Sequence, residues 1–473
     1  MDHLCKGFVK DIGFAIVYCN YKEQEVQTPT NLLSGVLRQL YDGTSLSDKV
    51  TDLHSKHAER KTRPALAEVS ELLRQEVTRF SKIFVIVDAL DECPEENQSL
   101  LLEELRALQP KAHLMVTSRP EVTAIAGSVQ LTITAHTEDL ARYIDGKVSG
   151  SSRLDNLLRK EADRRRVKET VIKKADGMFL LAQMHITTLA TATSMKQLSQ
   201  VLESLTENLD AAYEKTLERI DSQTSNDKVL AWRVLGWVSH ALRPISTKEL
   251  REALAIEPGA TKVEDDALPD TEVIMTVCAG LITLDRTTDL VRLVHYTTQQ
   301  YLERLKASRF TNMQMEIART CLLYLSFTGL GDEGLYKSVK RHPLLAYASQ
   351  YGLVHARGGP EVSLRAMILD IIGQEKKRSL IQLTVGIHSG KLSLSPIHLS
   401  VYFGLDTVLS QILSDGEDVN SNGPYGTAVT VASWRGFEPI ARLLLENGAD
   451  IDVQGGYFGN PLQAASSKGY EEI

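Results

Sequence analysis

The sequence predicts a multidomain protein of mixed class, in which a partial parallel α/β sheet is followed by helical domains, a winged helix and a helical repeat array. Three observations lead to this prediction. Strand patterns alternate with helical patterns up to residue 137, helical spacing prevails after it, and glycines recur at intervals of 32 and 33 near the C-terminus. The predicted domains are a parallel α/β core (1–137), a helical domain (138–227), a winged helix (228–305), a helical linker (306–390) and a repeat array (391–473).

The first domain alternates strands with helices, which is typical of a right-handed parallel α/β sheet. Its most distinctive strand contains five consecutive apolar residues, 83–87, which fit a strand buried on both faces. We expect strands at 13–18, 83–88, 113–117 and 129–134, and helices at 30–41, 65–80 and 96–108.

Polar side chains follow two of these strands at the point where each strand ends. Asp88 closes the second strand, with Asp91 and Glu92 just beyond it, and Arg119 follows the third. Ligands of parallel sheets bind at the carboxyl ends of the strands, so these residues predict a nucleotide site. Asp88 is expected to hold Mg²⁺, and Arg119 to contact a terminal phosphate. Asp91 or Glu92 would orient or deprotonate an attacking water.

A plainer interpretation of the same residues exists. Asp88 would then be a polar strand terminus, and Asp91 and Glu92 would be acids that favour the dipole of the next helix. The tight spacing of the acids, followed by a strand that ends in Arg119, favours the nucleotide site.

The phosphate-binding half of such a site does not occur in these 473 residues. A phosphate loop has the pattern G-x-x-x-x-G-K-[ST], because backbone N–H groups, a lysine and a hydroxyl must surround the phosphates together. The nearest segment, 386–393, has the wrong glycine spacing and carries Leu392 in place of the hydroxyl. We therefore expect Met1 to lie just downstream of a missing loop, and this chain to hydrolyse little or no nucleotide.

The composition is that of a globular protein, with 43% hydrophobic and 24% charged residues. A net charge of −8 gives no reason to expect nucleic acid or an anionic membrane as a partner, and no apolar run is long enough to span a membrane. The five cysteines are scattered and form no C-x-x-C pair, which indicates a reduced, intracellular, cytoplasmic setting. Cys93 follows Glu92 directly, so its thiolate is expected to be disfavoured.

Helices alone are expected in the second domain, at 139–144, 154–175, 179–190 and 198–220. The stretch 153–174 is rich in Arg and Lys, which is compatible with a nucleic-acid face. A solvated helix face agrees better with the acidic total.

The third domain has the order helix, helix, helix, hairpin, which is that of a winged helix. Ser246 and Glu249 predict a capping box, and the helix that they open carries no basic recognition face, so we expect a structural module. His295 follows the hairpin, where a lone histidine is either a packed core residue or a ligand. The expected elements are helices at 229–241, 248–256 and 273–279, and strands at 281–284 and 290–294.

The chain ends in a repeat, after a helical stretch (312–385) in which no chemistry is visible. Segment 414–420 aligns with 446–452, and each helix pair of such an array buries one face against its neighbour. The middle unit, 440–450, is similar to the end of an ankyrin repeat. The third unit stops at Ile473, so the C-terminus also looks cut.

Taken together, the acids at 88–92, the Thr117-Ser118-Arg119-Pro120 strand end, the winged helix and the repeats resemble fungal NACHT–ankyrin proteins. These are P-loop NTPases of the STAND class, akin to NOD-like receptors. The resemblance covers nearly the whole chain apart from the phosphate loop. It includes a nephrocystin 3-like N-terminal region and a winged helix of the inositol-deacylase type.

The resemblance implies ATP or ADP with Mg²⁺ as cofactors, with Asp88 as the Walker B residue that binds magnesium. It implies Asp91 and Glu92 as the extended acids, Arg119 as sensor 1, and a contact between His295 and the β-phosphate. It also implies a switch that self-assembles with ATP, while the ankyrin repeats bind a protein partner. The alternative is a constitutive ankyrin scaffold whose nucleotide fold is degenerate.

Overall fold

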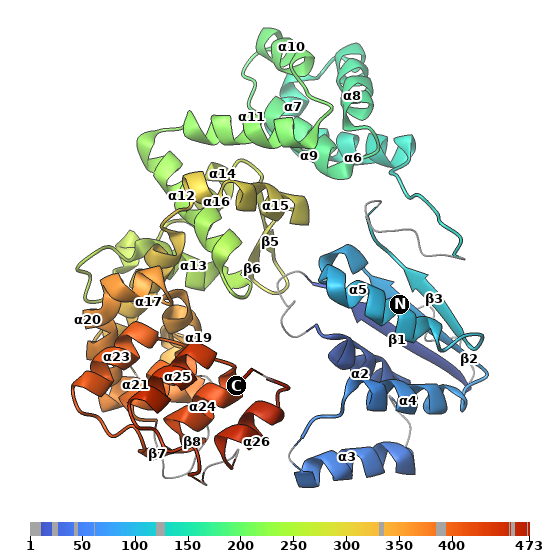
Figure 1. Cartoon of the computed structure of the whole chain (residues 1–473). Coiled ribbons are helices and arrows are strands. Elements are labelled where there is room, and N and C mark those ends of the chain that lie inside the picture. Colours follow the sequence, from blue (N-terminus) through green and yellow to red (C-terminus); the bar gives the residue numbers. More distant parts are fainter. Residues whose placement is uncertain are drawn as a thin grey trace. The chain divides into compact units, whose positions relative to one another are not determined.

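The computed structural model describes residues 11–20, 27–41, 46–60, 62–119, 128–330, 335–384, 394–453, 455, 459–470 and 472–473. The chain divides into two compact units, one of residues 1–131 with 465–471 and one of residues 132–464 with 472–473. The helices and strands of both units are labelled in Figure 1. Within the described residues, no helix combines the length and the apolar character that are needed to cross a membrane.

The first unit contains a parallel sheet of three strands in the order β1–β2–β3, which are Ile12–Tyr18, Lys82–Asp88 and Ala112–Val116. Their register pairs Tyr18 with Asp88, and Val87 with Val116. The carboxyl ends of all three strands therefore lie at the same edge. Three of the four predicted strands are confirmed.

The predicted strand at 129–134 is wrong, because residues 128–136 have no regular secondary structure. Val129, Leu131 and Ile133 are 89%, 80% and 86% exposed. An alternating apolar pattern forms a strand only where a neighbouring strand satisfies its backbone, and no described strand pairs with this segment.

One face of the sheet is buried under helices. Ile83, Val85 and Val87 join a buried cluster with leucines of α2 (Pro29–Leu40), α4 (Leu66–Val77) and α5 (Glu95–Arg106). The expectation of burial on both faces is wrong for the described residues, since Phe84 and Ile86 are only half-buried and Met115 of β3 is 54% exposed. The sequence analysis did not predict α3 (Asp48–Arg60), a mostly polar and charged helix with only three apolar residues, Val50, Leu53 and Ala58.

The second unit begins with helices, and two of the predicted long helices are each divided in two. The predicted helix at 154–175 breaks at Leu158, and the one at 198–220 breaks where the Asn208 side chain accepts hydrogen bonds from the N–H groups of Asp210 and Ala211 and starts a new helix. The observed helices are α6 (Thr137–Ser149), α7 (Ser152–Leu157), α8 (Glu161–Ala175), α9 (Phe179–Leu189), α10 (Met195–Glu203) and α11 (Leu209–Asp221).

A small antiparallel sheet in the order β4–β6–β5 follows, packed with four helices. The predicted capping box is present, because the Ser246 hydroxyl accepts from Glu249 N–H and the Glu249 carboxylate accepts from Ser246 N–H. The elements are α12 (Ser225–His240), β4 (Ile245–Ser246), α13 (Thr247–Ala255), α14 (Thr271–Val277), β5 (Ile282–Asp285), β6 (Leu290–Leu293), α15 (Tyr296–Arg304) and α16 (Lys306–Arg309).

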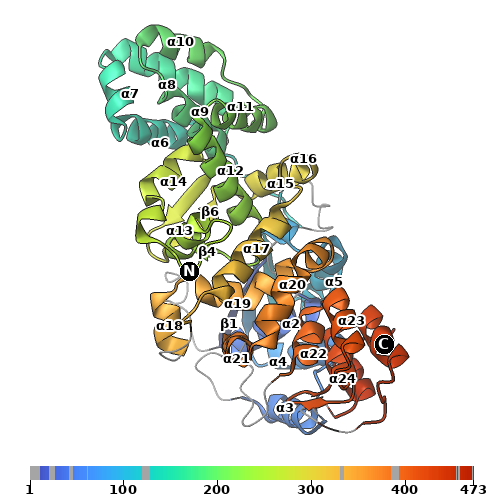
Figure 2. The ribbon, with the colours of Figure 1, turned by 90° about the vertical axis from the view of Figure 1, so that its left-hand side faces the viewer.

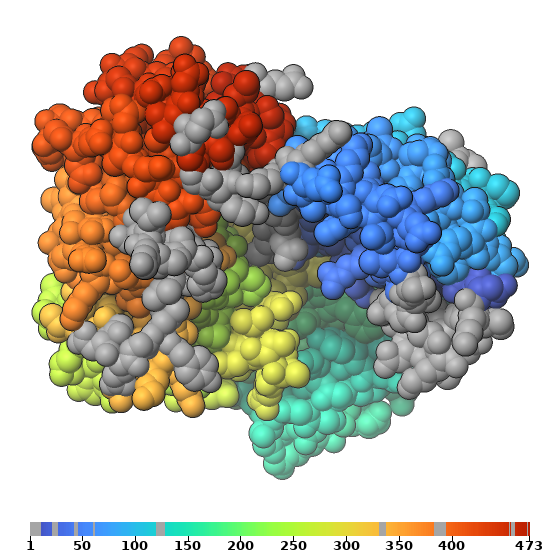
Figure 3. All heavy atoms as spheres, turned by 90° about the horizontal axis from the view of Figure 1, so that it is seen from below, coloured from blue at the N-terminus to red at the C-terminus, as the bar shows by residue number. Residues whose placement is uncertain are grey.

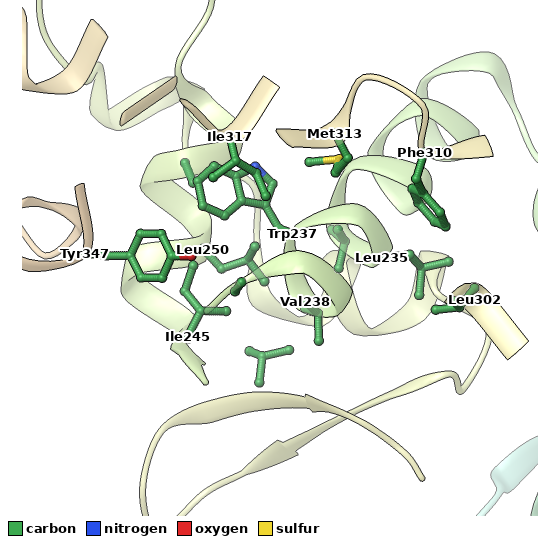
Figure 4. Packing of buried hydrophobic residues seen from close by; sticks show 14 of the residues in the cluster. Leu235, Trp237, Val238, Ile245, Leu250, Leu302, Phe310, Met313, Ile317 and Tyr347 are labelled. Carbon is green, nitrogen blue, oxygen red and sulfur yellow. The ribbon is translucent and has the colours of Figure 1, made fainter. Parts of the chain in front are cut away.

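The winged-helix region and the helical linker share one core around Trp237 of α12 (Figure 4). Trp237 is fully buried, and its ring meets Tyr347 edge to face, with 5.9 Å between the ring centroids. The linker helices are α17 (Met313–Ser326), α18 (Leu335–Arg341), α19 (Leu344–His355), α20 (Gly359–Gly373) and α21 (Glu375–Thr384).

A buried hydrogen-bond chain accompanies this core. Leu242 N–H donates to the Tyr347 hydroxyl at 3.1 Å, and that hydroxyl donates to His355 Nε2 at 2.8 Å. His355 Nδ1 donates in turn to the side-chain oxygen Oε1 of Gln314 at 2.6 Å. Burial lowers the pKa of His355 to about 4, so the imidazole is neutral at pH 7 and can accept from the tyrosine.

The C-terminal part consists of helix pairs that stack side by side (Figure 2). Gly404 and Gly436 end the first helix of their pairs with φ of 72° and 76°, and Gly416 and Gly448 follow the second helix with φ of 89° and 85°. The elements are α22 (Pro396–Phe403), α23 (Asp406–Ser414), β7 (Asn422–Gly423), β8 (Gly426–Thr427), α24 (Ala428–Arg435), α25 (Glu438–Glu446) and α26 (Pro461–Ser466).

Hydrogen bonds join successive units of this array. His398, only 1% exposed, bonds through Nε2 to the Gly426 carbonyl at 3.1 Å. The Asn420 side chain donates to Gly448 O and accepts from Asp450 N–H. In Figure 3 the array is drawn in orange to red and forms a continuous surface.

Replacing Tyr347 by Phe keeps the ring against Trp237 but leaves Leu242 N–H and His355 without their hydroxyl partner. We expect Tyr347→Phe to lower the free energy of unfolding of the second unit by about 1–3 kcal/mol. Urea denaturation followed by tryptophan fluorescence measures this loss. The half-buried Tyr351, changed to Phe, is the control and should remain within about 0.5 kcal/mol of the wild type. Equal stability of the two variants would contradict a structural role for the chain.

Glu361 of α20 is fully buried, and its Oε1 accepts from Val408 N–H at 2.7 Å at the start of α23. Burial, together with nearby Asp406, raises the pKa of Glu361 to about 7, whereas an unfolded glutamate titrates near 4.3. The native state therefore keeps a proton that the unfolded state loses, and stability falls as pH rises from about 4 to 7.

Glu361→Gln should thus be more stable than the wild type at pH 8, by up to about 3 kcal/mol, with no advantage near pH 4. Thermal melts at pH 4, 6 and 8 test this difference. The matched control is Glu417→Gln, an exposed glutamate on the array, whose melting temperature should follow the wild type at every pH. A pH-independent effect of Glu361→Gln would argue against the titration.

Candidate functional site

The carboxyl edge of the parallel sheet brings Asp88 next to Thr117, the residue that follows β3. Thr117 N–H donates to Val87 O at 2.9 Å, which continues the parallel ladder one residue beyond the strand. The Thr117 hydroxyl then donates to Asp88 Oδ1 at 2.6 Å. Thr117 was not predicted as a site residue. The signal that could have found it is a hydroxyl residue directly after the strand, in register with the acid.

The backbone turns sharply between the strand acid and the next two acids. Ala89 has φ 54° and ψ 50°, a left-handed conformation that is costly for a residue other than glycine. Two hydrogen bonds hold it, because Ala89 N–H donates to the Thr117 hydroxyl and Leu90 N–H donates to Thr117 O, both at 2.9 Å. Strained backbone that is held in this way is frequent at functional sites.

The following 3₁₀ turn, η2 (Leu90–Glu92), carries both predicted catalytic acids. Asp91 binds Arg119 twice, since its Oδ1 accepts from Arg119 N–H and its Oδ2 lies 3.3 Å from Arg119 Nε. Both side chains are partly buried, 15% exposed for Asp91 and 25% for Arg119. Asp91 is therefore an ion-pair partner of the predicted sensor arginine in this structure. The role of Asp91 and Glu92 toward an attacking water stays a prediction.

The fit of this edge to magnesium rests on Asp88. Among the described residues, no group of three or more His, Cys, Asp or Glu side chains is arranged to hold a metal ion. Protein-bound Mg²⁺ commonly takes only one or two carboxylates, with water and phosphate oxygens completing the octahedron. Asp88 can serve as the single carboxylate ligand of such a site. The hydrogen bond from Thr117 fixes the orientation of its carboxylate.

His295 belongs to the second unit. It is exposed and forms the N-cap of α15, where its Nδ1 accepts from Thr297 N–H at 3.2 Å. The interpretation as a packed core residue is therefore wrong. The β-phosphate contact of His295 stays a prediction.

Cys93 and Cys19 share a hydrogen bond, so their thiols titrate together and the expectation for Cys93 alone stays a prediction. A hydrogen bond with Cys19 lowers the pKa of the Cys93 thiol, against the opposing effect of burial. Glu92 and Asp91 act on Cys19 instead, where they add to the rise in pKa.

Two comparisons with domain families agree with the sequence analysis. Residues 2–119 match the family described as "Nephrocystin 3, N-terminal", and residues 217–313 match "GPI inositol-deacylase, winged helix domain". Both domain types were expected, and both are confirmed.

A curated relative adds to these matches. Over 303 residues the chain is 29% identical to the "Azaphilone pigments biosynthesis cluster protein L" of Monascus ruber. The matched region covers 55% of this chain and 63% of that protein, so the chain spans less than two thirds of the length of its relative. Together, the two domain matches and this distant fungal relative fit a NACHT-like, NTPase-associated family of NOD-like type.

Proposed function

We propose that this chain belongs to an intracellular signalling sensor of the NOD-like receptor type, in which a nucleotide gates assembly and ankyrin repeats bind a protein partner. The observation that carries the proposal is the hydrogen-bonded edge of the parallel sheet. There Thr117 orients Asp88, and Asp91 holds Arg119, at the ends of neighbouring strands. A strand-edge carboxylate and a strand-edge arginine are the two side chains that a magnesium-bound polyphosphate requires on this side.

Each residue has a distinct role in this proposal. ATP or ADP with Mg²⁺ would supply the negative charge to which the site responds. Asp88 binds the magnesium, directly or through water, and Arg119 binds the terminal phosphate, for which it must leave Asp91. Glu92 and Asp91 orient water, and the β-phosphate contact of His295 rests on the family resemblance alone. The site thus converts the presence of a phosphate into the breaking of one ion pair.

Turnover is expected to be very low. No phosphate loop occurs in the sequence, so the backbone amides and the lysine that provide most of the electrostatic stabilisation are missing from this chain. A switch that responds to occupancy needs only differential binding between two conformations.

The helix pairs of the C-terminal part support an ankyrin array as the partner-binding element. Their glycines adopt matching positive φ angles one repeat apart, and His398 links one unit to the next. A groove of about 590 Å³ opens along α20, α23 and α25, and its lining includes Arg365, Asp406, Arg442 and Glu446. Charges of both signs there suit a protein surface better than a polyanion.

The second candidate is a constitutive scaffold, in which ankyrin repeats bind partners and the nucleotide fold is degenerate. The missing phosphate loop favours it. The two functions differ in one measurable property, because only the sensor changes its assembly state with nucleotide.

The size of the protein in solution therefore distinguishes the two. We expect the molar mass from light scattering to increase with a non-hydrolysable MgATP analogue relative to MgADP, and Asp88→Asn and Arg119→Ala to abolish the increase. Asp48→Asn, on the polar helix α3 of the same unit, is the control and should retain it. A mass that does not depend on nucleotide would favour the scaffold.

The Asp91–Arg119 ion pair makes a prediction of its own. Asp91→Asn keeps an oxygen to accept Arg119 N–H but removes the charge that competes with phosphate. The affinity for MgATP should then rise about fivefold, which corresponds to about 1 kcal/mol for a partly buried ion pair. Isothermal titration measures this affinity. A loss of affinity in Asp91→Asn would show that the carboxylate serves the ligand instead of restraining the arginine.

A further inference from the structure

The groove of about 590 Å³ follows a seam between two successive units of the C-terminal array. Its walls are α20, α23 and α25, which lie side by side in this order (Figure 1). The lining residues of α23 recur at the spacing of one helix face, and those of α25 occupy the same positions 32 residues later. They are Thr407, Ser410, Gln411 and Ser414 in α23, and Pro439, Arg442, Leu443 and Glu446 in α25.

The α23 side of the groove is polar and can pair with a peptide backbone. Ser410 and Ser414 donate their hydroxyls to carbonyls of their own helix, at 2.9 and 2.8 Å. Their oxygens therefore keep lone pairs that can accept an N–H group. Arg365 of α20 and Arg442 of α25 supply donors for carbonyl oxygens. A helix satisfies its backbone internally and binds through apolar side chains, so this groove suits an extended segment better.

The charge of the array indicates the chemistry of that segment. Residues 394–473 contain ten acidic and three basic side chains, so they carry −7 of the net charge of −8. Within the groove, Asp406 lies at the start of α23 and Glu446 at the end of α25. Allowing for the repeat of 32 residues, these acids are eight helical positions apart, which is about 12 Å along the helix direction.

The two arginines do not cancel this negative charge. Arg442 is compensated on its own helix, because its pKa is raised first by the hydrogen bond to Glu438 and also by the charge of Glu446. Arg365 has no ion-pair partner in the part of the chain that the structure describes, and it is exposed. With Glu438 beside the groove, three acids therefore face two arginines.

We propose that this groove binds an extended basic segment of a partner protein, in which two Lys or Arg residues four positions apart meet Asp406 and Glu446. An extended chain rises about 3.3 Å per residue, so four positions span about 13 Å, close to the separation of the two acids along the groove. The inference deepens the proposed function by naming the chemistry of the partner, and it rests on the part of that proposal that concerns the repeats.

Fluorescence anisotropy of labelled peptides with the full chain tests the proposal. The probe is Gly-Lys-Ala-Ser-Ala-Lys-Gly. One reference peptide has the same composition with its two lysines adjacent, and another has glutamate in place of both lysines. We expect the spaced lysine peptide to bind about fivefold more tightly than the adjacent one, since only it can meet both acids, and the glutamate peptide not to bind. High salt should weaken the binding.

Variants of the chain locate the binding. Asp406→Asn keeps an oxygen for Thr407 N–H, and Asp406→Asn and Glu446→Gln should each lower the affinity about threefold, with about tenfold for the double variant. The matched control is Glu417→Gln, which removes an equal charge from the array outside the groove and should bind like the wild type. Arg365→Gln should retain or strengthen the binding, because it removes a positive charge.

Absence of peptide binding, equal affinity for the adjacent-lysine peptide, or an equal loss in Glu417→Gln would overturn the proposal. So would tighter binding of the glutamate peptide that Arg365→Gln abolishes, which would identify an acidic partner. The molar mass with nucleotide is measured separately. Groove-dependent binding by a chain whose mass ignores nucleotide would support this inference and contradict the sensor, whereas a nucleotide-dependent mass without peptide binding would do the reverse.

Discussion

The parallel register of the first unit is the constraint on which the candidate site depends. Backbone hydrogen bonds run from Cys19 N–H to Asp88 O and from Thr117 N–H to Val87 O, so three strands end at the same level. The last residue of β2, Asp88, and the residues that follow β1 and β3, Cys19 and Thr117, therefore lie at one edge of the sheet. A slip of one residue would turn every side chain to the opposite face and separate Asp88 from Thr117. The acid network around Asp88 follows from this register.

In the second unit, the corresponding constraint is the packing of Trp237. Its indole N–H has no hydrogen-bond partner in the described part of the chain, so shape and apolar contact hold the ring. Directional bonds lie next to it, in the chain from Leu242 through Tyr347 to His355. Apolar packing supplies the stability here, while the buried polar chain selects one arrangement of α12 against α19.

The sequence was informative where one local pattern determines the outcome. An apolar run bounded by Asp88 suffices to predict a strand and its polar carboxyl end, and Ser246 with Glu249 suffices to predict a helix start. Local pattern failed at 129–134, because a strand also needs a neighbour. It failed again at the helix start capped by Asn208, where apolar spacing continues across the break.

The candidate site also has some features that the local sequence determines and others that depend on distant segments. The sequence indicates that Asp88, Asp91 and Arg119 are site residues. It does not indicate that Asp91 and Arg119 form an ion pair, because an ion pair depends on distances between separate segments. The Cys93 thiol illustrates this most clearly. Its neighbours in the chain are acids, yet its thiol also shares a hydrogen bond with Cys19, 74 positions away. The exposed N-cap position of His295 likewise depends on where the hairpin ends and α15 begins.

The outer edge of β3 has a consequence for handling the protein. One side of β3 pairs with β2, while its other side has no partner strand among the described residues, and Met115 on this strand is half exposed. Unpaired strand edges recruit strands from other molecules, and the exposed side chains of Val129 and Leu131 in the same unit add a second apolar segment. Purified on its own, the first unit would thus be prone to self-association through its backbone. The colloidal behaviour of any fragment that contains it depends on whether this edge is covered.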